Sequence, residues 1–230
     1  MHGSCASRRY RWLLAERHAK DMSHESAPDV PALTTASFPG QVRSVQFALV
    51  TLWFSVHQLR ANTFMASAAV QLEKMGDTRG VYMSLYTALL PTGPLFSPLF
   101  AWLYSRLGLL GLMQAVTAAA ALFCGGLLLP YLPLQLLTFV VFVGYNTGIY
   151  TVYNLYVLQV FGPRSMGSIL GAIALASSVT NFLVYPISGV VASRLEGRWT
   201  LVNAAFALLT LLELAQVDGC RRLWARRRPL

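Results

Sequence analysis

Four polar side chains in the stretch 45–67 could line the path of a solute through a membrane: His57, Gln58, Arg60 and Asn62. The rest of this stretch is largely apolar, and a bilayer core of roughly 30 Å needs about 20 residues of helix. Ionisable side chains inside a span usually face the bundle interior or a water-filled cavity. Because His57 and Arg60 are three residues apart, they share one face of a helix. The spacing therefore predicts a helix that lines a translocation cavity, with the other spans arranged around it.

Both ionisable residues also have a simpler interpretation. At the helical rise per residue, Arg60 lies roughly 22 Å along the helix from Val45, which leaves under about 10 Å to the far interface. A snorkelling arginine can cover that distance. His57 lies nearer the midplane, where it can be a hydrogen-bonded packing residue. The sequence leaves these alternatives open.

A second polar set lies in the stretch 134–161. Asn146, Tyr150, Tyr153 and Asn154 are spaced 4, 3 and 1 residues apart, so they form one stripe of a helix. Amides and phenols offer hydrogen bonds without charge, which suits a neutral or zwitterionic solute. The alternative is that they bond between helices and hold a bundle together, at about 0.6 kcal/mol per bond.

Weaker candidates lie nearer the C-terminus. In the stretch 166–194, Asn181 and neighbouring hydroxyl residues form a minor polar set, and Gly167 and Gly171 form a GxxxG pair typical of helix packing. Glu213 is the only carboxylate inside an expected span, about 6 Å from its inner end, and is expected at the interface. Only His57 could then relay protons at the midplane, which favours facilitated diffusion.

The composition is that of a polytopic membrane protein. Of 230 residues, 55% are hydrophobic and only 12% are charged, against about 25% charged in a soluble domain. The net charge of +9 does not indicate nucleic acid, because the basic residues cluster at the two ends of the chain. No disulfide framework, metal site, catalytic residue or cofactor is expected, so the chain is not expected to be an enzyme. The three cysteines are far apart in the sequence: Cys5, Cys124 and Cys220. Three of the four histidines lie in the N-terminal segment: His2, His18 and His24.

The hydropathy pattern predicts an all-α fold with one transmembrane domain, 45–217. It lies between a basic, disordered cytosolic segment, 1–44, and a basic cytosolic tail, 218–230. Most of the 18 Lys and Arg residues fall on the side of the two termini, so both termini are predicted to be cytosolic. The six expected spans are 45–67, 80–104, 107–129, 134–161, 166–194 and 199–217.

The six spans divide into two sets of three with a shared pattern. The first helix of each set is the polar one, and the second is interrupted by proline, at Pro91, Pro94 and Pro98 and again at Pro186. Interrupted segments at corresponding positions are typical of inverted-repeat transporters. The pattern therefore predicts a 3+3 inverted repeat.

The loop between the second and third spans carries a known motif in degenerate form. Leu103, Arg106 and Gly108 match the pattern G-x-L-x-D-R-x-G, while Ala101 and Ser105 replace its first Gly and its Asp. With six spans and cytosolic termini, the chain resembles the C-terminal half of a major facilitator superfamily transporter. The resemblance implies that Arg106 and Gly108 belong to a gating loop. In that family the Asp of the motif pairs with a helix end or a basic residue during gating, and Ser105 cannot form this pair.

Shorter motifs are similar to solute carrier family 43, the carriers of large neutral amino acids. They are Gln58-Leu59-Arg60 with Phe64-Met65, the run 166–171, and the run 181–186. The resemblance implies sodium-independent facilitated transport of neutral amino acids by alternating access, with the plasma membrane as the expected location. Such carriers have twelve helices, so this chain is expected to be a half or truncated carrier in the lipid bilayer. It would pair with an upstream segment or with a second copy. The alternative is a non-transporting membrane subunit, a truncated pseudo-transporter that acts by helix–helix association.

Overall fold

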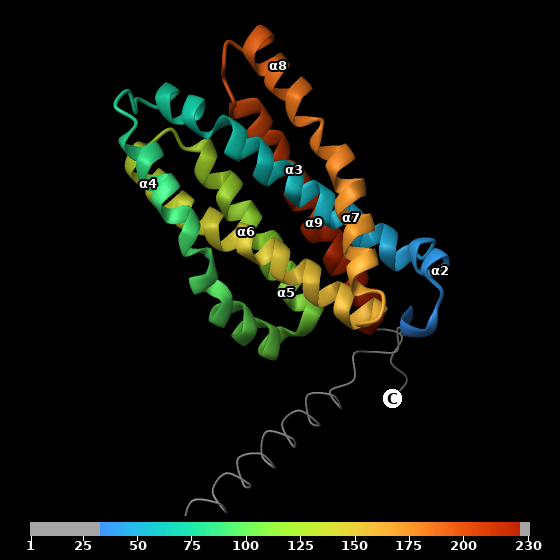
Figure 1. The fold of residues 1–230 in the computed structure, drawn as a ribbon. Coiled ribbons are helices and arrows are strands. Elements are labelled where there is room, and N and C mark those ends of the chain that lie inside the picture. The colour runs from blue at the N-terminus through green and yellow to red at the C-terminus, as the bar shows by residue number, and fades with distance from the viewer. Residues whose placement is uncertain (1–32, 226–230) are drawn as a thin grey trace, which may run out of the picture.

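The computed structural model describes residues 33–225, with side chains placed as far as residue 214. Within this range the chain is helical and contains no strand, which confirms the all-α prediction (Figure 1). The elements are η1 (Leu33–Thr35), α2 (Phe38–Val42), α3 (Val45–Lys74), α4 (Val81–Leu89), η2 (Leu90–Phe96), α5 (Ser97–Leu128), α6 (Leu132–Phe161), α7 (Met166–Asn181), α8 (Val184–Arg194) and α9 (Thr200–Ala225).

Three helical stretches among the described residues are long and apolar enough to cross a membrane: Val81–Leu128, Leu132–Phe161 and Met166–Arg194. The stretch Thr200–Leu214 is apolar but shorter. α3 is long enough, but its polar residues lower its mean hydropathy. The sequence predicts six spans, and three stretches of the described structure are long and apolar enough to be spans. The first of them, Val81–Leu128, covers two of the predicted spans.

A bend at Gly108 divides α5 into two arms. Gly108 has φ 67° and ψ −175°, a conformation that glycine adopts without steric cost. Both arms face the same point of α6, because a Cβ at Gly148 would meet Phe100 of the first arm and Val116 of the second. Figure 1 shows the chain turning back between these arms. The predicted boundary between the second and third spans therefore lies at a real turn.

Proline breaks two of the long stretches, as the sequence predicts. η2 replaces regular α-helix between α4 and α5 and contains Pro91 and Pro94. α7 and α8 are separated at Phe182 and Leu183. Pro186 lies four residues after Phe182. Proline has no N–H to donate to the carbonyl of the residue four positions earlier, and its ring clashes with that carbonyl, so the helix is interrupted at Phe182.

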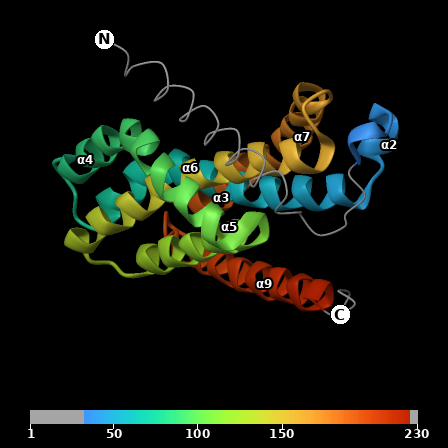
Figure 2. The ribbon, with the colours of Figure 1, turned by 90° about the horizontal axis from the view of Figure 1, so that it is seen from below.

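α3 forms the middle of the bundle. It packs against α6 and α7, while α9 lies against α5 at the opposite edge from α7 (Figure 2). Aromatic rings fill the space between α3, α5 and α6, with Phe64, Phe123 and Phe142 within 5.0 Å of one another by ring centroid. The side chains of α3 are therefore buried on several faces, including polar ones.

The two predicted end segments differ in part from the structure. Residues 1–32 and 226–230 lie outside the described residues. Within the predicted disordered head, η1 and α2 are helical, because Gln41 is 1% exposed and its Nε2 donates to Leu33 O (2.7 Å) and Phe161 O (3.4 Å). Gln41 thereby satisfies a carbonyl at the end of α6. α9 continues to Ala225, so the helix extends into the predicted tail.

Asp77 fixes the start of α4. Its carboxylate accepts hydrogen bonds from Val81 N (2.8 Å) and Met83 N (3.0 Å). These N–H groups have no partner within the helix. Asp77→Ala is expected to lower the free energy of unfolding by about 1–2 kcal/mol, measured by thermal unfolding in detergent. The exposed neighbour Thr78→Ala serves as the control, and an equal loss in both variants would contradict a capping role.

Candidate functional site

The four polar residues of the stretch 45–67 that were predicted to line a cavity separate into two sets. His57 and Arg60 are buried, at 0% and 1% exposure, and point into the bundle. Gln58 and Asn62 are half-buried and contact α6 and α7. His57 and Arg60 therefore share one face, as their spacing predicts, and α3 carries an inner polar set and an outer one.

The inner set belongs to a buried polar centre, which we define by its residues: Trp53, His57, Arg60, Thr117, Tyr145 and Glu213. Its main contact is an ion pair across the bundle, in which Arg60 Nη2 donates to Glu213 Oε2 over 3.0 Å. Arg60 also lies 5.9 Å from the ring centroid of Phe206. A buried charge is tolerated only when it is paired and hydrogen-bonded, so this contact neutralises both groups inside the protein.

Hydrogen bonds determine the tautomer of His57. Arg60 Nη1 lies 3.1 Å from His57 Nδ1 and 3.2 Å from Tyr145 Oη. A guanidinium group can only donate, so Nδ1 accepts and the ring proton is on Nε2. Nε2 faces Thr117 Oγ1 at 3.4 Å and Glu213 Oε2 at 3.8 Å. The neutral imidazole thus bridges the cation and the anion.

The rest of the centre is consistent with this assignment. Tyr145 Oη lies 2.9 Å from His57 Nδ1 and 3.2 Å from the backbone carbonyl oxygen of His57, so its one proton has two acceptors within reach. Thr117 Oγ1 donates to Met113 O (2.9 Å), and Trp53 Nε1 donates to Thr117 Oγ1 (3.3 Å). The threonine oxygen can therefore accept from both Trp53 and His57, since a hydroxyl has two lone pairs. α3, α5, α6 and α9 all contribute to this network.

The structure favours one alternative for each ionisable residue. Arg60 turns into the bundle at 1% exposure instead of extending outward, and Glu213 lies in the middle of α9 at 8% exposure, because α9 continues past residue 217. His57 takes the packing role that the sequence left open. A charge argument could have found the pair: two isolated opposite charges in apolar helices are stable only together.

The outer set belongs to an amide face, which we define as Gln58, Asn62, Asn146, Tyr150, Asn154 and Asn181. Gln58 Nε2 donates to Tyr150 Oη (2.9 Å), and Asn62 Nδ2 donates to Asn181 Oδ1 (3.0 Å). Asn154 Nδ2 donates to Tyr150 O (2.7 Å). All six side chains are half-buried or exposed, and they come from α3, α6 and α7.

Tyr153 does not belong to this face. It is 7% exposed, stacks on Phe54 with ring centroids 4.2 Å apart, and donates to Leu170 O. The prediction of a four-residue stripe on α6 is corrected to Asn146, Tyr150 and Asn154, which are spaced by four residues. Tyr153 lies about 60° from Tyr150 around the helix and is covered by α3 and α7.

The remaining predicted residues lie away from both sets. Arg106 is exposed beside the bend at Gly108. Gly167 and Gly171 are exposed, and a Cβ added at either would meet no atom within 4 Å. They therefore bring no two helices together within the described part of the chain.

Within residues 33–214, no group of three or more His, Cys, Asp or Glu side chains could hold a metal ion. No protein-family model, no curated protein and no solved structure matches the chain. The function is therefore inferred from the buried polar centre, the amide face and the outer surface of the helices.

Proposed function

We propose that the chain is an integral membrane protein, a six-helix half of a carrier that moves small neutral solutes, neutral amino acids foremost. Its exterior supports a membrane location. Leu95, Leu175 and Tyr185 are 78%, 72% and 75% exposed, and many other large apolar side chains are exposed as well. Soluble monomers rarely expose continuous apolar surfaces larger than a few hundred Å².

The amide face is the observation on which the transport proposal depends. It places uncharged hydrogen-bonding groups from three helices on an otherwise apolar exterior. Polar groups facing hydrocarbon are costly, so this face suits a water-filled path better than lipid. The charged pair of Arg60 and Glu213 is buried away from it. A face with amides and phenols but no free charge favours a neutral or zwitterionic solute.

A second half would cover the amide face and complete the path, either an upstream segment or a second copy of the chain. Solute would bind between the halves, near the middle of the helices. The proline-interrupted stretches α4–α5 and α7–α8 give two places where the halves could rock, with Arg106 and Gly108 at the turn between the arms of α5. The distribution of Lys and Arg supports cytosolic termini, and we place the carrier in the plasma membrane.

Tyr150→Phe tests the solute path, because it removes one hydroxyl from the amide face and keeps the ring. The full chain is produced in cells, and uptake of radiolabelled neutral amino acids is measured at matched surface levels. Uptake efficiency is expected to fall about tenfold, the effect of losing one hydrogen bond worth about 1.4 kcal/mol.

Tyr131→Phe is the matched control, because it makes the same change at an exposed tyrosine just before the start of α6, far along that helix from Tyr150. It is expected to keep full uptake. The comparison requires that cells producing the parent chain take up more labelled amino acid than untransfected cells do. Full uptake in Tyr150→Phe and in Asn154→Ala would contradict the proposed path.

The second candidate function is a non-transporting membrane subunit. The exposed side of α7 and α8 favours it, because Gly167, Gly171 and Gly189 leave open space there. Small residues let another helix approach closely. In that case Gly171→Leu would abolish association with the partner, and changes in the amide face would have no effect.

A further inference from the structure

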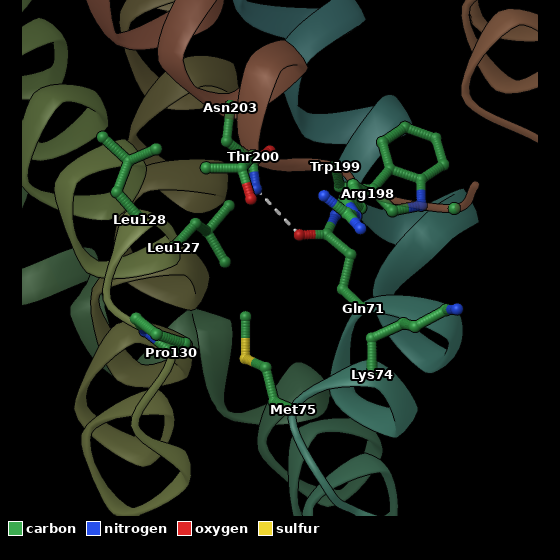
Figure 3. Close-up of a pocket in the computed structure, with 11 residues that line it drawn as sticks. Gln71, Lys74, Met75, Leu127, Leu128, Pro130, Arg198, Trp199, Thr200 and Asn203 are labelled. Carbon is green, nitrogen blue, oxygen red and sulfur yellow. Dashed lines mark hydrogen bonds between the residues drawn. The ribbon is translucent and has the colours of Figure 1, made fainter. Parts of the chain in front are cut away.

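A pocket with one apolar and one polar wall lies between the end of α3, the end of α5 and the start of α9 (Figure 3). Its volume is about 240 Å³. It lies at one end of the helices, far along α3 from the buried polar centre. Neither the centre nor the amide face contributes a residue to it. Its lining includes Gln71, Lys74, Met75, Leu127, Arg198 and Asn203.

The apolar wall comes from the α5–α6 connection. Leu127, Leu128 and Pro130 lie on one side of the pocket, and Met75 extends toward them from the end of α3 (Figure 3). Just beyond, Tyr131 is 64% exposed. Apolar side chains next to an exposed tyrosine are typical of a membrane–water interface. Trp199, on the pocket's other side, is buried at 8% exposure.

The polar wall is built and basic. Asn203 Nδ2 donates to Gln71 Oε1 over 2.8 Å, and the two residues are 6% and 4% exposed (Figure 3). Lys74 and Arg198 stand at the rim. The carboxylate nearest Arg198 is Glu196, at 3.5 Å, but both side chains are more than three-quarters exposed. Such a surface pair is weak, so an anion can compete for the guanidinium group.

We propose that this pocket binds the phosphate group of an amphipathic anion, such as the headgroup of an anionic phospholipid. Arginine and lysine are the usual phosphate partners. In the proposed topology the pocket lies at the end of the bundle opposite the cytosolic termini, so the lipid would come from the outer leaflet. The volume is below the range of about 300–1,000 Å³ for drug-sized ligands, so it admits a headgroup but no acyl chain. The chains would run down the apolar exterior beside Leu129, which is 52% exposed.

This site depends on the membrane location in the proposed function but not on transport. The test measures binding to the purified full chain in detergent, so its failure would leave the uptake experiment untouched. Three probes are compared: phosphatidylglycerol, phosphatidylcholine and inorganic phosphate. Phosphatidylglycerol is expected to bind at least tenfold more tightly than phosphatidylcholine, measured by lipid retention in native mass spectrometry and by the rise in the thermal unfolding midpoint.

The double variant Lys74→Ala/Arg198→Ala is expected to weaken phosphatidylglycerol binding about thirtyfold. The matched control is Arg79→Ala/Arg194→Ala, which removes two exposed charges at the same end of the bundle but outside the pocket. It is expected to change binding less than threefold. A third result is that inorganic phosphate stabilises the parent chain, that phosphatidylglycerol does not, and that the double variant loses the effect of phosphate. This result would support a phosphate site whose ligand is soluble and not a lipid. Equal losses in both double variants, or no preference for phosphatidylglycerol and no effect of phosphate, would overturn the proposal.

Discussion

Glu213→Ala is expected to destabilise the folded chain by about 3–5 kcal/mol, the cost of leaving one partner of a buried ion pair alone. Arg60 is 1% exposed, and among the described residues it keeps Tyr145 and His57 as its hydrogen-bond partners once Glu213 is gone. Neither neutral group balances its charge. The expected result is a much smaller folded fraction, measured as the monodisperse peak on size-exclusion chromatography and as a lower thermal midpoint in detergent.

The double variant Arg60→Met/Glu213→Leu separates pairing from packing. It removes both charges and fills their space with apolar atoms, and such replacements are often neutral or stabilising. Stability is therefore expected to return to near that of the parent. A double variant as unstable as Glu213→Ala would show that the centre acts through something other than the charge pair. Two buried atoms, Arg60 Nε and Glu213 Oε1, have no hydrogen-bond partner among the described residues, which adds to the expected gain.

Gly148→Leu is expected to destabilise the chain by about 3 kcal/mol through overpacking. A Cβ at this position would lie 2.8 Å from Val116 Cγ2 and 2.9 Å from Phe100 Cζ. Both contacts come from α5, one from each arm, and both residues are buried. α6 cannot move away from one arm without pressing on its other neighbours, because the interior is close-packed.

Gly171→Leu is the matched control for this variant. It makes the same substitution within a helix, but a Cβ there would meet nothing within 4 Å. Thermal unfolding in detergent is expected to show a loss for Gly148→Leu and no loss for Gly171→Leu. Similar losses in both would contradict the close approach of α5 and α6. Retained stability with lost association in Gly171→Leu would instead support the subunit function.

α3 connects the two parts of the candidate site. Its inner face carries His57 and Arg60, and its outer face carries Gln58 and Asn62. The ion pair to Glu213 therefore holds in place the helix that supplies part of the amide face. Variants of Arg60 should act on uptake through the fold, whereas variants of Tyr150 should act on it directly.

Local features could be predicted from the sequence because they depend on neighbours along the chain. Proline removes a hydrogen bond four residues back, so the breaks before α5 and between α7 and α8 follow from Pro91, Pro94 and Pro186. Glycine permits a positive φ, and the turn at Gly108 lies where the motif placed it. The residue spacing also placed Asn146, Tyr150 and Asn154 on one stripe of α6, but it wrongly included the buried Tyr153.

Which stripe is covered, and by what, depends on helices far apart in the sequence. Arg60 and Glu213 are 153 residues apart, and no local pattern relates them. Periodicity placed His57 with Arg60, but only the packing of α5, α6 and α9 enclosed both and left Gln58 and Asn62 outside. The sequence by itself determined the long helices and their interruptions at proline and glycine, because these depend on residues that are neighbours along the chain. The tertiary structure alone decided which polar groups are buried together, because burial and charge pairing depend on distances in space and not on spacing along one helix.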